Sequence, residues 1–241
     1  MTSAVTVGGR FGAGARRLGY RDPRSGCDIV ITTPSAEPRL WRDYLAGALA
    51  TYRAHGVEHA LDFEQMQDGR SSSLIFVVLG ADGRAIGGIR TQGPYTRADQ
   101  AHAVAEWEGD PGQAAVRATI ERMVPDGVVE VKAAWGADDH PARRELVACM
   151  SRTPIHAATV LGARYAVGTA AAHSLLGWAR AGAVTAPDVS PVAYPDERFR
   201  TRLAWFDLSA LSPTLTERER RALDDEAAQL RAPLVPTQAA R

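Results

Sequence analysis

Residues 74–90 read LIFVVLGADGRAIGGIR. Leu74–Leu79 is a continuous apolar run, which is typical of a strand buried on both faces. The following Gly80–Gly83 (GADG) supplies glycines that can adopt the positive φ of a tight turn. Ala85–Arg90 then has the composition of a returning strand. The stretch therefore predicts an antiparallel hairpin, around which the rest of the domain can be placed.

Downstream of this hairpin the chain alternates between helical and extended patterns. Apolar residues at helical spacing predict a helix over Gln113–Met123, and β-rich runs predict strands at Val128–Trp135 and Arg164–Ala170. Asp139 and Pro141 signal the start of a helix between those strands, and we expect Pro154 to divide that helix into two pieces. A last helix of this alternating series is expected over Ser174–Ala181.

The outer segments complete the expected domain. A strand at Asp28–Thr33 and a helix ending near His55 precede the hairpin, while a strand at Phe199–Leu208 follows it. Thr216 and Glu219 fit a capping box that opens a charged helix to about Leu230. We therefore expect a flexible N-terminal arm over residues 1–26, one domain over 27–208, and a C-terminal helix and tail over 209–241.

Composition limits the classes of function. The 241 residues contain 28 basic and 28 acidic side chains, so net charge offers no argument for a nucleic-acid partner. No apolar run reaches the ~18 residues of a membrane span, and no apolar segment of a secretory signal follows the N-terminus, so a cytoplasmic protein is expected. The two cysteines, Cys27 and Cys149, lack metal-type spacing, and no metal is expected.

The order of elements from Asp28 to Leu208 resembles the GCN5-related N-acyltransferase superfamily. Within it, the chain is most similar to the branch of acyl-homoserine-lactone synthases and N-acyl amino acid synthases. Three short signals carry this: the acidic segment Asp62–Asp68, the run Gly87-Gly88-Ile89-Arg90, and Glu130 on the next strand. The resemblance implies an α/β (α+β) fold with a mixed, mostly antiparallel central sheet flanked by helices.

The resemblance also implies a reaction, in which an acyl group passes from acyl-CoA or an acyl carrier protein to an amine of a small molecule or amino acid. Glu130 would then be the general base. Backbone N–H groups would stabilise the oxyanion near Ala133, Ala134, Trp135 and Gly136. Arg90 would hold a donor phosphate or an acceptor carboxylate, since its planar fork suits either.

The chain also departs from the superfamily pattern. The usual phosphate loop is replaced by Gly136–Arg144 (GADDHPARR), where Arg143 and Arg144 are the groups that could meet a phosphate. Trp178 stands where a tyrosine acid is common, so His173 becomes the candidate acid. Each candidate also has an ordinary interpretation, such as an ion pair of Glu130 with Lys132 or Arg90, or a solvated face for the arginines.

These departures leave two functions open. The first is an N-acyltransferase, and the alternative is a non-catalytic member of the same fold that binds a ligand or partner in the same cleft. The charged C-terminal helix, Thr216–Leu230, further suggests a homodimer.

Overall fold

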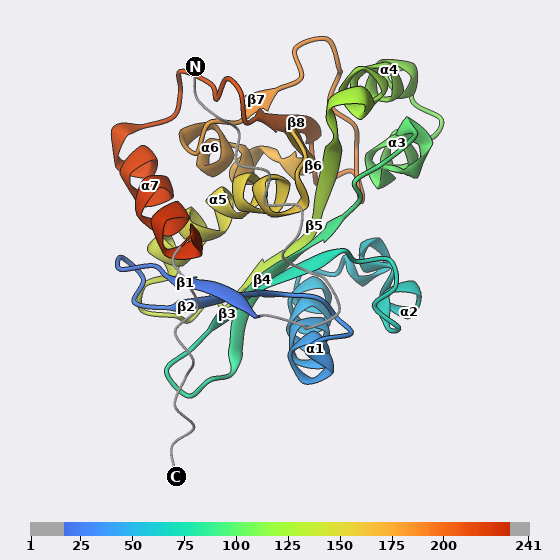
Figure 1. Ribbon diagram of the computed structural model, residues 1–241. Coiled ribbons are helices and arrows are strands. Elements are labelled where there is room, and N and C mark those ends of the chain that lie inside the picture. Colours follow the sequence, from blue (N-terminus) through green and yellow to red (C-terminus); the bar gives the residue numbers. More distant parts are fainter. Residues whose placement is uncertain (1–16, 232–241) are drawn as a thin grey trace.

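The computed structural model describes residues 17–231, apart from the side chain of His173. Its centre is one eight-stranded sheet in the order β1-β2-β3-β4-β5-β6-β8-β7 (Figure 1). Only the β5–β6 pair is parallel, so the predicted mixed, mostly antiparallel sheet is confirmed. The strands are β1 Leu18–Arg21, β2 Asp28–Thr32, β3 Leu74–Leu79, β4 Ala85–Gln92, β5 Val128–Gly136, β6 Tyr165–Ala171, β7 Val184–Thr185 and β8 Thr201–Asp207.

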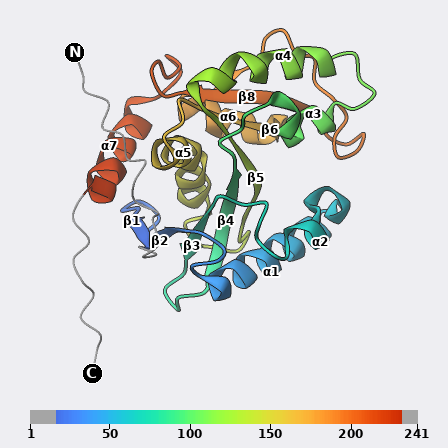
Figure 2. The same ribbon diagram turned by 45° about the vertical axis from the view of Figure 1, so that its right-hand side comes forward.

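Helices cover both faces of this sheet (Figures 1 and 2). On one face, α5 packs on β4, β5 and β6, α6 packs on β6, and α7 packs on β1 and α5. On the other face, α1 packs on β3, β4 and β5, and α3 and α4 cover the far end of the sheet. The helices are α1 Pro38–Ala54, α2 Phe63–Met66, α3 His102–Glu106, α4 Gln113–Met123, α5 Arg143–Leu161, α6 Ala172–Arg180 and α7 Glu217–Arg231.

The predicted hairpin lies at the middle of the sheet. Phe76 of β3 pairs with Ile89 of β4, and both side chains are buried in the core beneath α5. Ile75 and Val77 point to the opposite face, where they meet α1 through Trp41 and neighbouring side chains. A strand that is buried on both faces explains why Leu74–Leu79 is apolar throughout.

The prediction that Pro154 divides the helix after β5 was wrong, because α5 runs unbroken from Arg143 to Leu161 with Pro154 inside it. A proline lacks the N–H that would bond to the carbonyl four residues earlier, here that of Met150. The hydroxyl of Thr153 donates to this carbonyl at 2.7 Å and replaces the missing bond. Burial of the whole central part of α5 favours its continuity further.

The N-terminal arm predicted over residues 1–26 is also partly wrong. Leu18–Arg21 forms β1, which pairs antiparallel with β2, and Leu18 and Tyr20 are buried in the core. Leu18 and Tyr20 are two residues apart, so both point to the core face when this segment is extended. That is enough for a short edge strand that pairs with the unpaired edge of β2. The rest of the predicted arm, residues 1–16, lies outside the described residues.

Other elements fall in stretches that the pattern left irregular. Residues 95–112 contain the 3₁₀ turn Ala98–Gln100 and helix α3. Before the hairpin, the 3₁₀ turn Glu58–Leu61 precedes the acidic segment Asp62–Asp68, which contains α2. These elements are only three to five residues long, too short to show a helical period. The further 3₁₀ turn Val124–Asp126 joins α4 to β5.

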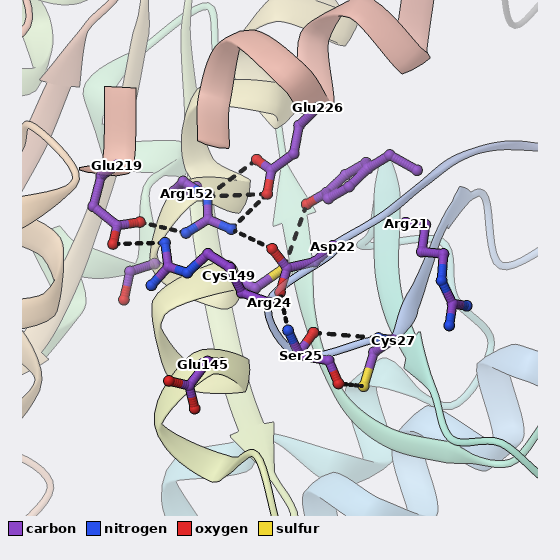
Figure 3. Close-up of polar contacts among 12 residues, drawn as sticks. Arg21, Asp22, Arg24, Ser25, Cys27, Glu145, Cys149, Arg152, Glu219 and Glu226 are labelled. Carbon is purple, nitrogen blue, oxygen red and sulfur yellow. Dashed lines mark hydrogen bonds and ion pairs between the residues drawn. The ribbon is translucent and has the colours of Figure 1, made fainter. Parts of the chain in front are cut away.

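A buried ionic network joins α5, α7 and the segment after β1 (Figure 3). The guanidinium of Arg152 donates to carboxylates of Asp22, Glu219 and Glu226, and its side chain is fully buried. His156 adds a 2.7 Å contact to Glu226. Burial alone would raise the pKa of Glu226, but hydrogen bonds from His156 and Arg152 outweigh it and lower the pKa. The network fixes the C-terminal helix to the body of the domain.

Candidate functional site

The candidate site lies where β5 and β6 separate. The parallel pairing of these strands ends at Glu130 and Val167, although β5 continues to Gly136 and β6 to Ala171. Beyond that point β5 stays bonded to β4 and β6 stays bonded to β8. The open edges of two diverging strands leave backbone N–H and C=O groups without sheet partners, which is the type of position where a ligand can bind to backbone groups.

A β-bulge lies on the separated part of β5. Gly88 pairs with Trp135 and Arg90 pairs with Lys132, so Ala133 and Ala134 together oppose Ile89. Ala133 has a φ of 51°, a conformation that costs an L-residue about 1–2 kcal/mol. The hydroxyl of Tyr44 on α1 donates to the Ala133 carbonyl at 2.8 Å and holds the bulge in place.

The positions Ala133, Ala134, Trp135 and Gly136 were predicted to supply oxyanion donors, and this bulge is where they lie. Ala134 is exposed and Trp135 is buried against α1, with Gly47 of that helix facing its ring. Gly136 faces Leu146 and Met150 of α5. The bulge is therefore accessible at Ala134 and supported from both faces of the sheet.

Four polar side chains, Arg90, Gln92, Glu130 and Lys132, form what we call the polar face of β4 and β5. The register places Arg90 opposite Lys132 and Gln92 opposite Glu130. Residues between them, such as Ile89 and Val131, point into the core under α5. A polar row on the inner side of a covered sheet is costly unless it is hydrogen-bonded or binds a ligand.

Glu130, the predicted base, is fully hydrogen-bonded in this structure. It accepts the hydroxyl of Tyr95 at 2.7 Å and the backbone N–H groups of His102 and Ala103 at 2.8 and 2.9 Å. Its side chain is 1% exposed. These contacts seat the N-terminus of α3 on the sheet, which is a structural role for the carboxylate.

Arg90, the predicted anion-binding residue, is buried and poorly paired. Its Nη1 reaches the Ser71 carbonyl and the Ser72 hydroxyl only at 3.4 Å, and its buried Nε has no hydrogen-bond partner. Glu106 on α3 likewise has a buried Oε2 without a partner. Buried polar atoms without a partner are uncommon in folded proteins. One basic and one acidic atom of this kind on the same face of the sheet indicate a binding site for a polar ligand.

Lys132 makes no hydrogen bond or ion pair with any residue that the structure describes. Burial lowers the pKa of its ammonium, and the positive charge of Arg90 lowers it further. The carboxylates of Glu130, Glu106 and Asp62 act in the opposite direction. The net result is a pKa below the usual range. The cation that acts on it is Arg90 of β4, directly across the sheet.

A histidine between two carboxylates lies at one side of the polar face, and the sequence did not predict it as a site. The ring of His102 lies between two carboxylates, with Nδ1 2.9 Å from Glu106 and Nε2 3.2 Å from Asp62. Tyr52 on α1 completes this side, and burial followed by the charge of Glu106 raises its pKa to about 12. The His102–Glu106 spacing of four was the available signal, but nothing in the sequence placed Asp62 beside it.

The remaining predicted residues lie apart from the polar face. Arg143 and Arg144 open α5 and are exposed, and Arg143 forms an ion pair with Asp138. His173 is the second residue of α6, and its side chain lies outside the described part of the structure. Trp178 is buried against Phe206, and its ring lies over Gly168 on β6, next to the point of strand separation.

Metal-type donors gather at one other place among residues 17–231. Ligand atoms of Asp22, Cys149 and Glu226 lie within 4.8 Å of one another. The guanidinium of Arg152 already binds both carboxylates, and burial raises the pKa of the Cys149 thiol, so the group is satisfied by a protein cation. No helix within these residues has the length and apolar character needed to span a bilayer.

Comparison with solved structures identifies the fold class. FeeM, an N-acyl amino acid synthase from uncultured soil microbes, is 13% identical with a TM-score of 0.54, covering 82% of this chain and 94% of FeeM. BjaI, a CoA-dependent acyl-homoserine lactone synthase solved with SAM and isopentyl-CoA, is 15% identical with a TM-score of 0.52, covering 92% of each chain. The chain has the GCN5-related N-acyltransferase fold, in the form found in this branch.

Sequence comparison then identifies the family. A protein of Mycobacterium tuberculosis and one of Mycobacterium bovis, both described as uncharacterized, are each 41% identical over 186 residues, which is 77% of this chain and 71% of theirs. The chain belongs to the same family as these mycobacterial proteins. No protein-family model matches the sequence.

Proposed function

We propose that the protein is an N-acyltransferase that moves an acyl group from a thioester to the amine of a small molecule or amino acid. The observation that carries this proposal is the separation of β5 from β6 after Glu130, with the Ala133–Ala134 bulge on the separated part of β5. A thioester carbonyl placed there would meet backbone donors, and oxyanion donors of this kind are each worth ~10²–10³ in rate. The fold shared with FeeM and BjaI supports the same assignment.

The donor would lie along the separated strands, with its acyl carbonyl at Ala134 and its pantetheine between β5 and β6. Arg143 and Arg144, exposed at the start of α5, would face the donor's phosphate or an acidic carrier protein. Acyl-CoA and acyl carrier protein share this phosphopantetheine chemistry. Reversal of Arg144 to Glu should weaken a carrier protein donor more than acyl-CoA, because only the carrier presents an extended acidic surface.

The acceptor would bind on the polar face. Arg90 has an unpartnered Nε and a planar fork, which fits a carboxylate, while Glu106 has an unpartnered carboxylate oxygen, which fits an ammonium. A molecule with both groups, such as an amino acid, would satisfy the two buried atoms together. This pairing supports an amino acid acceptor over a simple amine.

The test is a thioester panel. Purified protein is incubated with acetyl-, octanoyl- and palmitoyl-CoA, and with the same acyl groups on a carrier protein, in the presence of the common amino acids. We expect free thiol to appear with at least one donor and N-acyl amino acid to be found by mass spectrometry. A folded protein that neither binds nor turns over any of these thioesters would exclude the assignment.

The second candidate is a non-catalytic member that binds a ligand or partner in the same site. The hydrogen bonds of Glu130 favour it, because a carboxylate with three donors is poorly placed to take a proton. Under this hypothesis amino acids or acyl-CoA would bind by calorimetry without turnover. Turnover in the panel, lost in an Ala133→Pro variant that still folds, would exclude it.

A homodimer remains part of the proposal, with α7 as its contact. Glu219 and Glu226 of α7 bind Arg152, so truncating the helix would leave this arginine with Asp22 alone of its three carboxylates. The appropriate test is therefore charge reversal on the exposed side, at Arg221 and Asp225, followed by a mass measurement in solution. A dimer through α7 should dissociate, whereas an unchanged mass would rule this contact out.

A further inference from the structure

Lys132 is the sole lysine of the 241-residue chain, and it occupies a particular position. It lies on the polar face opposite Arg90 and immediately before the bulge residue Ala133. Its side chain is partly buried and makes no hydrogen bond or ion pair with the described residues. An amine left without partners beside an accessible stretch of backbone is free to interact with a bound molecule.

Glu130 and His102, the other candidate bases on this face, are already engaged, and the free oxygen of Glu106 is the group proposed to bind the acceptor ammonium. Both oxygens of Glu130 accept hydrogen bonds from Tyr95 or from the first residues of α3. Both ring nitrogens of His102 contact carboxylates, at Asp62 and Glu106. Of Glu130, His102 and Lys132, Lys132 is the one that makes no hydrogen bond or ion pair with the described residues.

The surroundings of Lys132 favour the neutral form of its amine more than water does for an exposed lysine. Burial and the facing Arg90 disfavour the ammonium form, whereas the carboxylates of Glu130, Glu106 and Asp62 favour it. The first two effects are larger, so the pKa of Lys132 is lowered. These charges come from β4, β5, α3 and the turn before α2, while α1, which also packs on β4 and β5, places the hydroxyl of Tyr52 beside Glu106. Lysines with lowered pKa values can act as general bases.

We propose that Lys132, in its neutral form, is the general base that takes the proton from the acceptor's ammonium group. This inference rests on the proposed acyl transfer and replaces Glu130 in that role, while Glu130 holds α3 in place. Arg90 binds the acceptor carboxylate, and its positive charge adds to burial in lowering the pKa of the neighbouring lysine.

The step balances without any further reactant. The Nζ lone pair of Lys132 takes one proton from the acceptor ammonium, leaving a neutral amine and a lysine ammonium. The amine nitrogen attacks the thioester carbonyl carbon, so that a C–N bond forms and an oxyanion develops at the bulge. The C–S bond then breaks, and the thiolate takes the remaining surplus proton from the new amide nitrogen. Lys132 finally releases its proton to water.

A single lysine allows its pKa to be measured directly. Protein grown with ¹³C-labelled lysine should give one side-chain Cε resonance, and its shift can be followed from pH 6 to pH 11 without substrate. We expect a midpoint clearly below the usual ~10.4. Arg90→Met should raise that midpoint by removing the facing cation. A wild-type midpoint at the usual value would overturn the proposal, whatever the activity.

The kinetic arm uses the donor and acceptor found active in the thioester panel. Lys132→Arg keeps a positive charge but cannot lose its proton, and Lys132→Met removes the charge; both should lower kcat by ~10²-fold or more, as expected for a lost general base. Lys132→His should restore part of the rate, with its pH dependence moved to lower pH. In the wild type, kcat/KM should rise with pH through the midpoint measured by NMR.

Four results separate the hypotheses. Full activity in Lys132→Arg, or a pH profile that does not follow the NMR midpoint, would overturn the role of Lys132 and leave acyl transfer standing. A rise in KM with unchanged kcat in Lys132→Met would make the lysine a binding residue and also overturn it. Absence of turnover in the wild type would overturn the proposed function and this inference together. Circular dichroism of each variant confirms that it is folded.

Discussion

Arg90 and Lys132 face each other across β4 and β5, so that two basic side chains lie side by side on one covered face of the sheet. Like charges directly opposite each other destabilise a sheet. Arg90 is 3% exposed, and within residues 17–231 its side chain donates hydrogen bonds only to Ser71 and Ser72, both at 3.4 Å. Such an arrangement is maintained at a cost to stability, which is typical of a binding site.

Replacing Arg90 with Met should therefore separate stability from function. We expect the free energy of unfolding to stay the same or to rise by up to about 1 kcal/mol, the range of cross-strand pair energies. The KM for a carboxylate-bearing acceptor should rise at least tenfold. Urea unfolding measures the stability, and the rate at increasing acceptor concentration gives the KM. The matched control is Arg97→Met, at an exposed position away from β5. Loss of stability without any change in KM would contradict it.

Tyr44→Phe tests the support of the bulge. The hydroxyl of Tyr44 donates to the Ala133 carbonyl, and loss of one such bond costs about 0.5–1.5 kcal/mol. Because the bulge is proposed to position the oxyanion donors, kcat should fall more than KM changes. Tyr165→Phe, on β6 and with no hydroxyl contact to the bulge, is the control in the same denaturation and rate measurements. Equal effects of both substitutions would remove the link to Ala133.

The Arg152 network should dominate the stability of the C-terminal helix. Replacing Arg152 with Met removes the guanidinium that three carboxylates share, and breaking a buried ion pair in this way costs about 3–5 kcal/mol. Part of the loss should be recovered at acidic pH, where the carboxylates become protonated. Arg221→Ala, which breaks an exposed pair with Glu217, should cost about 0.5 kcal/mol or less by urea unfolding. Similar losses for both variants would show that the network is not important.

Acid should weaken the contact between β8 and the start of β6. Hydrogen bonds from Arg164 lower the pKa of Asp207 from 3.8 to about 2, against an opposing effect of burial, and bonds from Ser209 add to the lowering. A carboxyl with a lowered folded-state pKa stabilises the fold above its unfolded pKa, and this stabilisation is lost as the pH falls toward about 2. Thermal denaturation between pH 4 and 2 should thus be less pH-dependent in Asp207→Asn.

Arg164→Met serves as the companion to that measurement. It removes the same pair from the other side, so it should flatten the acid dependence to a similar degree. An unchanged slope in both variants would mean that the pair does not contribute to acid stability.

Much of the fold could be predicted from local patterns. The hairpin strands, the helix at Gln113–Met123 and the strand from Val128 all lie where the periodicity of apolar residues placed them. Pro154 was misjudged because its compensation is a hydroxyl, that of Thr153, bonded to the carbonyl of Met150. The short helix α3 was missed because its N-terminus is held by Glu130, a residue distant in the chain.

The candidate site was predicted less well than the fold. Arg90 and the residues of the bulge were identified through a family resemblance, and they do lie together. Lys132 was considered only as an ion-pair partner for Glu130. Asp62, Glu106 and His102 come from separate segments, and only the packing of α3 against the turn before α2 brings them into contact.

The sequence by itself determined which segments become strands and helices, because the alternation of apolar and polar residues acts within a few residues of the chain. The tertiary structure alone decided which charges meet. The register of β4 on β5 sets Arg90 against Lys132 and produces the bulge at Ala133, and the pairing of β5 with β6 ends at Glu130. Both depend on hydrogen bonds between residues far apart in sequence, and burial then gives those charges an environment that no local pattern specifies.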